Sequence, residues 1–498
     1  MVFILVNQRE KKDMSREYRM YINGEWVDAS SGKTFDDYNP FTGEVFAKVP
    51  CGKREDTKQA IDAADAAWPA WAHTPPAQRA MYFLKAADIL EKKQKEVAQI
   101  LTEEAGTTFG VGMFQLGFTP GLLREAAAQV HGAMGEIIPA DLPGAFFMTV
   151  RQPVGVVAGI SPWNVPLILS LRAVAFPLAY GNTTVLKPSG ETPVSGGIVF
   201  AEVFEEAGFP KGVFNVVTNS PGFSEEVGDE LIANPKVRRI SFTGSTETGR
   251  HLAEKAGRHL KRVALELGGK DPLIVLRDAD IDYAVNAAVF GSFFHQGQVC
   301  MSVERIIVEK PVAQEFTEKL VKKAQGLKVG DPREPDTVIG PLINQEQLNK
   351  VRMHVEEAVA AGAKLRCGGK YEGLCYYPTV LTDVTADMKV FCEETFGPVA
   401  PVIVVQDADE AVRVANDSRY GLSAGIITRD FQKGLELAER IESGMVHIND
   451  SSIHDEPQVP FGGVKESGWG RHGGRAALEE FTELRWISMQ RTPRHYPF

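Results

Sequence analysis

Val154-Gly155-Val156-Val157-Ala158-Gly159-Ile160 is an unbroken apolar run. Apolar residues at successive positions, rather than at alternate ones, are typical of a strand that is buried on both faces of a parallel sheet. Three more strand-like segments follow, at residues 183–186, 213–217 and 239–243, with helical patterns between them. This alternation predicts a doubly wound α/β fold with a ligand site at the carboxyl edge of its strands.

Length and composition narrow the classes of protein to consider. A chain of 498 residues is too long for one hydrophobic core, so two or three domains are expected. The apolar fraction of 44% and the charged fraction of 24% are ordinary for a globular protein, which excludes a disordered chain or a coiled coil. The net charge of −11 is spread along the sequence without a basic block, so a nucleic acid partner is not expected.

The cysteines and the N-terminal residues indicate the cellular compartment in which the protein is expected. Five widely scattered cysteines fit neither a disulfide framework nor a zinc site, so we expect a reducing, cytoplasmic environment and no metal. No apolar segment has the length of a membrane span, and the run at residues 2–6 is too short for a signal peptide. We therefore interpret residues 1–19 as a flexible tail.

Cys300 ends the stretch Phe293-Phe294-His295-Gln296-Gly297-Gln298-Val299-Cys300 and is the candidate nucleophile. A thiolate is a strong nucleophile near neutral pH, although a lone cysteine is more often an inert small hydrophobe. Two other segments favour the catalytic interpretation. Glu266 lies between leucines, where a raised pKa would suit a general base, and Asn164 lies in the Pro162-Trp163-Asn164-Val165-Pro166 turn, where a rigidly held amide can stabilise an oxyanion.

Two segments mark the predicted ligand edge. Lys187-Pro188-Ser189 places a cation at the end of one strand, and Phe242-Thr243-Gly244-Ser245 opens a helix after another. The N–H groups at a helix N-terminus attract phosphate, although such a turn alone is also an ordinary helix N-cap.

Together these motifs resemble the aldehyde dehydrogenase superfamily. The matching segments are the PWN turn, KPS, FTGS, ELGGK, the GQ-x-C loop, residues 393–399 and residues 460–471, and the resemblance extends from about Tyr21 to Phe481. It implies a doubly wound Rossmann-like cofactor domain, an α/β catalytic domain and a small β arm for assembly into a dimer or tetramer. The corresponding ranges are a cofactor domain at 20–134 and 154–267, a catalytic domain at 268–448, an arm at 135–153 and 479–498, and an active-site loop region at 449–478 that returns to the cofactor domain.

The resemblance also implies roles for individual residues. Cys300 would add to an aldehyde, Asn164 would hold the oxyanion, and Glu266 would activate the water that hydrolyses the thioester. A base at Glu266 favours release of a free carboxylic acid over transfer to coenzyme A. The residues expected around NAD or NADP are Ile160, Pro162, Trp163, Lys187, Ser189, Gly190, Gly244, Ser245, Leu267, Glu394 and Phe396.

Three departures from the family pattern affect the cofactor site, the proton relay and the substrate pocket. Gly190 replaces a carboxylate that binds the adenosine ribose, with Glu191 next to it, which leaves use of NAD, NADP or both open. Ala173 and Arg475 occupy positions where a lysine and a glutamate often assist proton transfer. The third departure is in the substrate pocket, where Val165 replaces a common aromatic residue and Arg172 a common apolar one.

This pocket pattern is similar to the vanillin, benzaldehyde and salicylaldehyde dehydrogenases, so an aromatic aldehyde is the predicted substrate. Arg172 would meet a ring hydroxyl or carboxyl group, or alternatively form a structural salt bridge. The residues expected to line the pocket are Val165, Arg172, Val299, Ile453 and Phe461. The other functions considered are an aliphatic aldehyde or semialdehyde dehydrogenase, a cofactor-free thiol esterase and a structural protein without catalysis.

Overall fold

The apolar run that predicts the fold contains strand β8 (Val156–Ile160), which lies within an eight-stranded sheet. The computed structural model describes residues 16–132 and 134–498. From β8 the chain adds two parallel strands on one side and then crosses to the other side for two more. This reversal beside β8 makes the sheet doubly wound, as predicted, with a topological switch point between β8 and β11. Across the sheet the strands are β24 (Gly468–Trp469), β12 (Arg262–Glu266), β11 (Val237–Thr243), β8, β9 (Thr183–Lys187), β10 (Phe214–Val216), β2 (Met20–Ile22) and β3 (Glu25–Val27).

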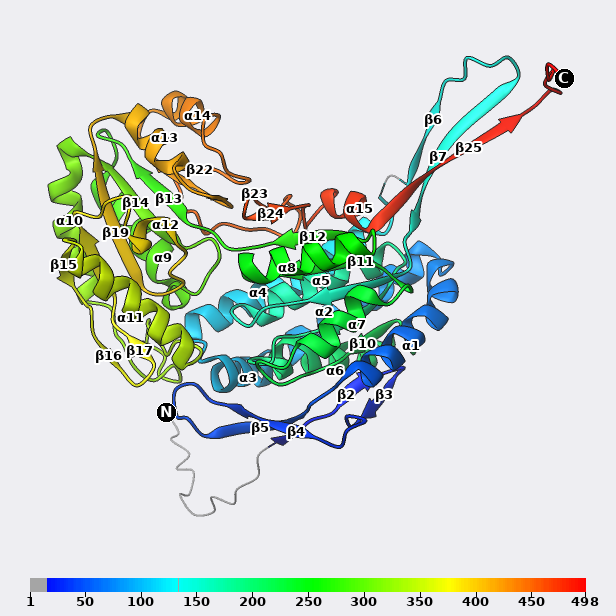
Figure 1. Ribbon diagram of the computed structural model, residues 1–498, viewed down its shortest axis with the longest axis horizontal. Coiled ribbons are helices and arrows are strands. Elements are labelled where there is room, and N and C mark those ends of the chain that lie inside the picture. The colour runs from blue at the N-terminus through cyan, green and yellow to red at the C-terminus, as the bar shows by residue number, and fades with distance from the viewer. Residues whose placement is uncertain (1–15, 133) are drawn as a thin grey trace.

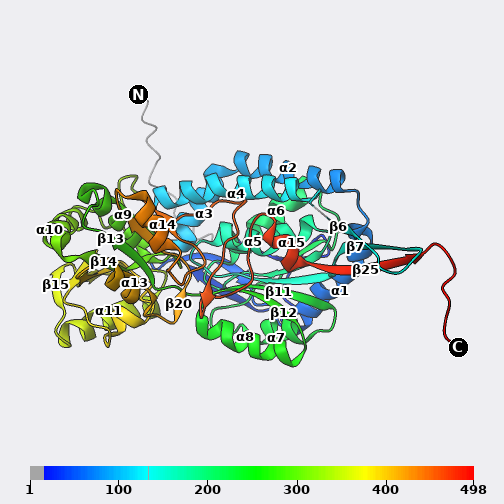
Figure 2. The ribbon, with the colours of Figure 1, turned by 90° about the horizontal axis from the view of Figure 1, so that it is seen from above.

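Helices cover both faces of this sheet (Figures 1 and 2). Those labelled α2 and α4 run along one face, and α7 and α8 along the other. Every residue of β8 and β9 is buried because each strand has helices on both sides, which explains the unbroken apolar pattern. The helices are α1 (Arg54–Ala72), α2 (Pro76–Lys92), α3 (Gln94–Ala105), α4 (Phe109–Gln129), α5 (Pro166–Ala179), η1 (Val194–Ile198, a π-helix), α6 (Val199–Ala207), α7 (Glu225–Ala233) and α8 (Thr246–Arg258).

A seven-stranded sheet forms the second half of the molecule, on the left in Figure 1. Only residues 267–270 separate the last residue of β12 from the first residue of this sheet's strand β13, so the two sheets are directly connected. Across the sheet the strands are β15 (Lys364–Cys367), β18 (Thr379–Thr382), β19 (Val399–Val405), β14 (Val303–Glu309), β13 (Asp271–Val275), β21 (Gly425–Ile427) and β22 (His447–Ile448). Its helices are α9 (Ile281–Phe293), η2 (Phe294–Gly297), α10 (Lys310–Gln325), α11 (Gln345–Ala360), α12 (Lys389–Cys392), α13 (Ala408–Asn416) and α14 (Phe431–Ala438).

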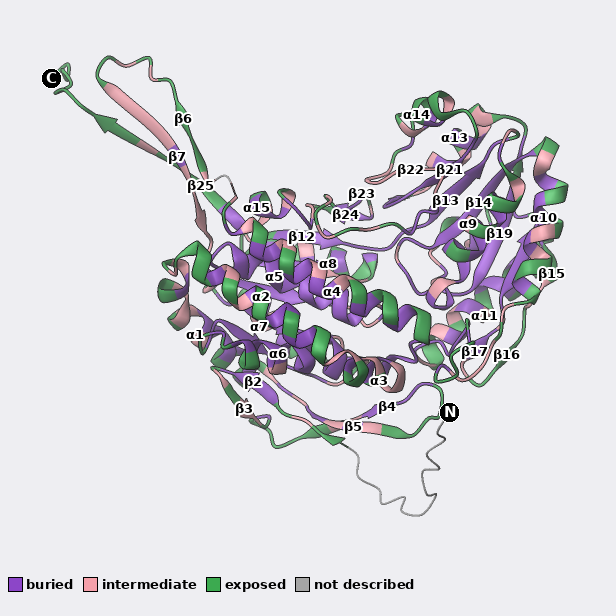
Figure 3. Ribbon diagram, turned by 180° about the vertical axis from the view of Figure 1, so that it is seen from behind, coloured by how far each residue is buried: buried purple, intermediate pink, exposed green. Residues whose placement is uncertain are grey.

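A three-stranded antiparallel sheet projects from the body and carries the C-terminus near its tip (Figure 1). Figure 3 shows that this arm is mostly exposed or half-buried, whereas the inner strands of the two large sheets, such as β8, β9, β13 and β14, are buried. Helix α15 (Ala476–Phe481) leads into the arm. The arm strands are β25 (Thr482–Gln490), β7 (Ala145–Pro153) and β6 (Gly135–Ile138).

The N-terminal segment differs in part from the predicted tail. Arg16 and Glu17 form strand β1 (Arg16–Glu17), which pairs in parallel with β5 (Val45–Pro50), itself paired with β4 (Thr34–Tyr38). The tail prediction is therefore wrong for these two residues, because the exposed edge of β5 provides backbone partners, and residues 1–15 lie outside the described part of the chain. The remaining short strands are β16 (Tyr371–Glu372), β17 (Cys375–Tyr376), β20 (Tyr420–Gly421) and β23 (Val464–Lys465).

Of the helices in the described residues, none combines the length and the apolar composition that a membrane crossing requires.

The buried side chain of Asn182 connects the start of β8 to the base of the arm. Its oxygen accepts hydrogen bonds from the N–H groups of Val154 and Gly155, at 2.7 and 3.1 Å. Its amide donates to the carbonyl oxygens of Pro177 and Phe481, at 3.0 and 2.9 Å. One side chain thus satisfies four backbone groups from three distant segments.

Replacing this residue tests that role. Asn182→Ala should lower the apparent Tm by roughly 5 °C, because the substitution leaves four backbone groups without their partner and each such buried group costs about 1–3 kcal/mol. The control is Asn349→Ala, which removes an exposed contact with Gln345 on α11. Thermal unfolding followed by circular dichroism measures both variants, and equal Tm values for the two would contradict the assignment.

Candidate active site

The carboxyl ends of β8 and β11 open into a cavity of about 530 Å³. Its lining includes Trp163 and Asn164 from the turn after β8, and Thr243 and Gly244 from the end of β11. Cys300, which precedes β14 of the second sheet, also lines it. The topological switch point of one sheet therefore faces the candidate nucleophile of the other, which is where a doubly wound fold is expected to bind its ligand.

A crevice of about 740 Å³ adjoins this cavity and shares part of its lining. The crevice includes the N-terminus of α8, whose N–H groups are donors suited to a ligand that carries phosphates. The predicted cofactor residues are divided between the two spaces. Ile160, Pro162, Trp163, Lys187, Ser189, Gly190, Gly244 and Ser245 line the crevice, and Leu267, Glu394 and Phe396 line the cavity.

Lys187 and Ser245 supply the polar chemistry of the crevice. Burial lowers the pKa of Lys187 to about 8, and its ammonium group donates to the Pro188 carbonyl oxygen at 3.4 Å. Ser245 is the N-cap of α8, where its hydroxyl accepts a hydrogen bond from the Thr248 N–H at 3.2 Å. The other N–H groups of the first turn have no partner within the helix and are suited to an anion. These residues fit a nicotinamide dinucleotide.

Gly190 is required by close packing as well as by any contact with a ligand. A Cβ atom at this position would lie 2.6 Å from the Pro221 nitrogen and 2.8 Å from the Asn219 carbonyl oxygen. A glutamate could therefore not replace Gly190 without moving the backbone. The neighbouring Glu191 also lines the crevice, where its carboxylate accepts a hydrogen bond from the Asn344 amide at 3.2 Å.

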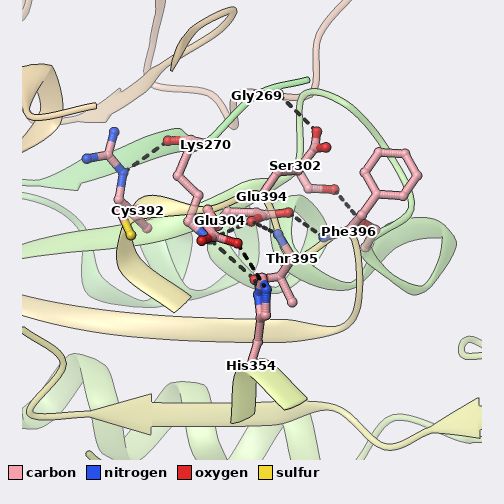
Figure 4. Close-up of polar contacts among 12 residues, drawn as sticks. Gly269, Lys270, Ser302, Glu304, His354, Cys392, Glu394, Thr395 and Phe396 are labelled. Atoms are coloured by element: carbon pink, nitrogen blue, oxygen red, sulfur yellow. Dashed lines mark hydrogen bonds and ion pairs between the residues drawn. The ribbon is translucent and has the colours of Figure 1, made fainter. Parts of the chain in front are cut away.

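Glu394 and Phe396 belong to a loop that is held by a buried carboxylate (Figure 4). Glu304 accepts hydrogen bonds from the N–H groups of Thr395 and Phe396, at 2.7 and 2.8 Å, and from the Lys270 ammonium group at 2.6 Å. These bonds hold Phe396 in a left-handed conformation, with φ of 56°. Sequence reasoning missed Glu304, because a carboxylate within a strand gives no motif.

The same loop positions two groups at the mouth of the cavity. The Phe396 ring meets the Trp163 ring edge to face, with centroids 5.5 Å apart. The Glu394 carboxylate accepts a hydrogen bond from the Gly269 N–H at 3.0 Å, and burial raises its pKa to about 7, an effect to which the charge of Glu304 adds.

The loop that presents Cys300 is conformationally strained. His295 and Gln296 both adopt left-handed backbone angles, with φ of 52° and 56°, which cost about 1–2 kcal/mol for each non-glycine residue. Side-chain hydrogen bonds hold this conformation. The Gln296 amide donates to the Pro341 carbonyl oxygen at 2.9 Å, and the Gln298 side-chain oxygen accepts from the Ile343 N–H at 3.0 Å.

Two hydrogen bonds fix Asn164 against this loop. The Asn164 side-chain amide donates to the Gln298 carbonyl oxygen at 2.9 Å. The Asn164 carbonyl oxygen, in turn, is 2.6 Å from Nε2 of His295. Because a carbonyl oxygen only accepts, and burial lowers the His295 pKa to about 4, this histidine is neutral and donates through Nε2–H.

Glu266, at the end of β12, is buried, and neither carboxylate oxygen has a hydrogen-bond partner within the described residues. The chain packs closely on it, since a Cβ atom at Gly462 would lie 2.6 Å from Oε1. Burial raises the Glu266 pKa well above its ordinary value, while Arg172 and Arg471 oppose the shift. The raised pKa predicted from its leucine neighbours is confirmed. Glu266 is not among the residues that line either cavity beside Cys300.

Burial also raises the pKa of the Cys300 thiol, and Asp271, Glu394 and Glu266 add to the effect. The thiol therefore stays protonated at neutral pH in the cofactor-free protein. A lowered pKa, which would populate the thiolate without help, does not occur here.

A second cavity of about 250 Å³ reaches Cys300 from another direction. All five predicted pocket residues, Val165, Arg172, Val299, Ile453 and Phe461, line it. Sequence reasoning missed three aromatic walls, Phe114, Phe290 and Phe294. The Phe294 ring lies 5.6 Å from Phe114 and 5.0 Å from Phe290, centroid to centroid. Phe290 and Phe294 are one helical turn apart, a spacing from which a shared face could have been inferred.

Comparisons with known proteins agree with this architecture. The model of the Aldehyde dehydrogenase family matches residues 26–487. A vanillin dehydrogenase of Pseudomonas sp. (strain HR199 / DSM 7063) is 47% identical over 96% of this chain and 99% of its own length. A benzaldehyde dehydrogenase [NAD(+)] of Pseudomonas putida is 44% identical over 98% and 100%. The crystal structure of a salicylaldehyde dehydrogenase from Pseudomonas putida G7 complexed with salicylaldehyde superposes with a TM-score of 0.95 at 42% identity, covering 97% of this chain and 100% of that one.

The pKa of Cys300 can be tested by alkylation of the cofactor-free protein. The rate at which Cys300 reacts with iodoacetamide should be low at pH 7 and should keep rising above pH 9. An ordinary cysteine, with a pKa of about 8.5, is mostly ionised above pH 9, whereas a cysteine with a raised pKa is still mostly protonated there. Mass spectrometry of the peptides measures each cysteine, and the exposed Cys392 is the internal reference. A Cys300 rate that levels off near neutral pH would contradict this prediction.

Proposed function

The chain belongs to the aldehyde dehydrogenase family, and from that membership we propose that it oxidises an aromatic aldehyde to the carboxylic acid through Cys300, with Glu266 as the base. The observation that supports an aromatic substrate is the 250 Å³ cavity, whose lining contains four phenylalanine side chains and Cys300. Flat aromatic walls favour a flat aromatic ring over a flexible chain. The names of the vanillin and benzaldehyde relatives support the same substrate class.

In the proposed reaction the Cys300 thiol gives its proton to solvent through the cavities that it lines, and its sulfur attacks the aldehyde carbon. The Asn164 amide and the Cys300 N–H then donate to the developing oxyanion, and removing such a donor typically costs about 3–4 kcal/mol. The hydrogen bonds that join Asn164 to Gln298 and His295 hold the Asn164 turn in a fixed position relative to Cys300. When bound in the adjoining crevice, a nicotinamide dinucleotide supplies the acceptor for the hydride that leaves the thiohemiacetal carbon.

Glu266 completes the cycle by removing a proton from the water that hydrolyses the thioester. Its raised pKa makes it a better proton acceptor once it is ionised, and its burial excludes competing water. A base at this position supports release of a free acid. Ala173 and Arg475 cannot serve as the usual relay groups, and the cations that lower the Glu266 pKa are Arg172 and Arg471.

The two functions of other classes, a thiol esterase and a structural protein, account for fewer of these structural features. A thiol esterase would have no use for the crevice around Lys187 and the α8 N-terminus, and a structural protein would have no use for a buried, unpaired Glu266. An aliphatic aldehyde or semialdehyde remains the second candidate substrate, because the cavity beside Cys300 imposes no chemical bar to it.

For the cofactor we propose use of both NAD and NADP. The crevice has no side-chain carboxylate at Gly190, and Lys187 provides a cation nearby, so a 2′-phosphate meets less repulsion. Glu191 is held by Asn344, which limits its approach to a ribose. We propose that residues 20–134 and 154–267 bind the cofactor and that residues 268–448 carry the nucleophile, with residues 449–478 as an active-site loop region that returns to the cofactor domain.

We also propose that the arm, residues 135–153 and 479–498, joins two copies of the chain into a dimer or tetramer. Strands β25 and β6 are both edges of the arm sheet, and their backbone groups are free to pair within the described residues. Leu484 and Trp486 on β25 are 56% and 64% exposed, an apolar surface that a partner would cover.

Turnover of benzaldehyde tests the proposed function. The protein should reduce both NAD and NADP in the presence of benzaldehyde and release benzoate, whereas Cys300→Ser should retain less than a few per cent of the rate, because the hydroxyl group is a far weaker nucleophile. Cys367→Ser, on the outer strand β15, is the control for cysteine substitution and should be as active as the unmodified protein.

Three outcomes would contradict parts of the proposal. Substantial activity of Cys300→Ser would remove Cys300 from the mechanism. Turnover of aliphatic aldehydes with none of benzaldehyde would exclude the aromatic substrate, and complete inactivity with NADP at millimolar concentration would exclude dual cofactor use.

A further inference from the structure

The substrate cavity contains a buried ion pair between an arginine and an aspartate. Arg172, on α5, lines the cavity with 3% of its side chain exposed. Its Nη2 group donates to Oδ2 of Asp455, whose side chain is 7% exposed. Asp455 belongs to the loop between β22 and β23 and was not predicted as a site residue.

Aromatic rings enclose the guanidinium group of Arg172. Its Cζ atom lies 4.4 Å from the centroid of the Phe461 ring and 5.8 Å from that of Phe118. These contacts and the bond to Asp455 hold the guanidinium group in one place. Arg172 is therefore a paired charge and not a free cation waiting for a substrate anion.

The other ionisable groups in the cavity lining leave no positive charge unmatched. His295 is neutral, because burial lowers its pKa to about 4. At the mouth, Glu456 is 52% exposed, and its Oε1 lies 3.8 Å from Nε2 of His454. His454 also pairs with Asp450, at 2.8 Å. The mouth is thus more acidic than basic, and the interior carries one balanced pair.

From this charge arrangement we propose that Asp455 determines substrate specificity by neutralising Arg172, so that the cavity selects aromatic aldehydes whose ring carries no negative charge. The inference rests on the proposed function and narrows its substrate class. A ring carboxylate beside Arg172 would share its single positive charge with the buried Asp455 carboxylate, so two negative charges would face one positive charge in buried surroundings. A neutral substituent imposes no such cost.

The test compares substrates that differ in charge but hardly in shape. The 3- and 4-formylbenzoates are anionic at neutral pH, and the corresponding formylbenzamides are neutral. For the unmodified protein, kcat/KM should favour each amide over its carboxylate by about tenfold or more, the range expected for losing a hydrogen bond to a charged group.

Asp455→Asn should release the charge of Arg172 while keeping a side chain of the same shape. The ratio of kcat/KM should then shift toward the carboxylate by about 10- to 100-fold at one or both ring positions. The matched control is Glu456→Gln, which removes the same charge from the same loop without touching Arg172. Because solvent screens that exposed group, its ratio should shift by less than about threefold.

The double variant Arg172→Met, Asp455→Asn tests whether the shift needs the arginine, and it should show no gain for the carboxylates. The proposal is overturned if the unmodified protein oxidises carboxylates and amides equally well, a comparison that does not depend on the folding of any variant. It is also overturned if Asp455→Asn and Glu456→Gln shift the ratio equally. If no neutral aromatic aldehyde is oxidised at all, the proposed function fails, and this inference fails with it.

Discussion

Two hydrogen bonds join the turn after β8 to the loop that carries Cys300. One runs from the Asn164 side chain to the Gln298 carbonyl oxygen, and the other from His295 to the Asn164 carbonyl oxygen. The turn follows β8 of the eight-stranded sheet, and the loop precedes β14 of the seven-stranded sheet. These bonds therefore set the position of one half of the site relative to the other. The left-handed backbone at His295 and Gln296 is held by the side-chain hydrogen bonds of Gln296 and Gln298.

The same close packing changes the pKa values of the two groups that react, Cys300 and Glu266. Burial raises the pKa of both Cys300 and Glu266, which favours the uncharged form of each side chain. Ionising either group near the other costs additional free energy, since each charge opposes the other. Addition of the thiolate to the aldehyde moves the negative charge from sulfur to the oxyanion beside the Asn164 amide, and loss of hydride would then remove that charge. The order in the proposed mechanism, with Cys300 acting first and Glu266 second, is consistent with this coupling.

The parts of the site that were predictable from the sequence are local in the chain. The apolar run of β8, the turn around Asn164 and the helix start at Ser245 each depend on neighbouring residues, so their structures follow from pattern. Contacts between distant residues were not predictable. Arg172 and Asp455 are separated by 283 positions, and the crowding of Gly190 by Pro221 depends on how two loops pack. The interpretation of Arg172 as a salt bridge was an alternative from sequence, but its partner was unknown.

The central claim is that Cys300 forms a thioester that Glu266 then hydrolyses, and a stopped-flow experiment with Glu266→Gln tests it most directly. Mixing this variant with benzaldehyde and cofactor should give a burst of reduced nucleotide stoichiometric with active sites, followed by very slow turnover, because the amide keeps the shape of the side chain and loses the base. Loss of the burst in a variant that still binds cofactor would contradict the claim, and would assign Glu266 to the activation of Cys300 instead.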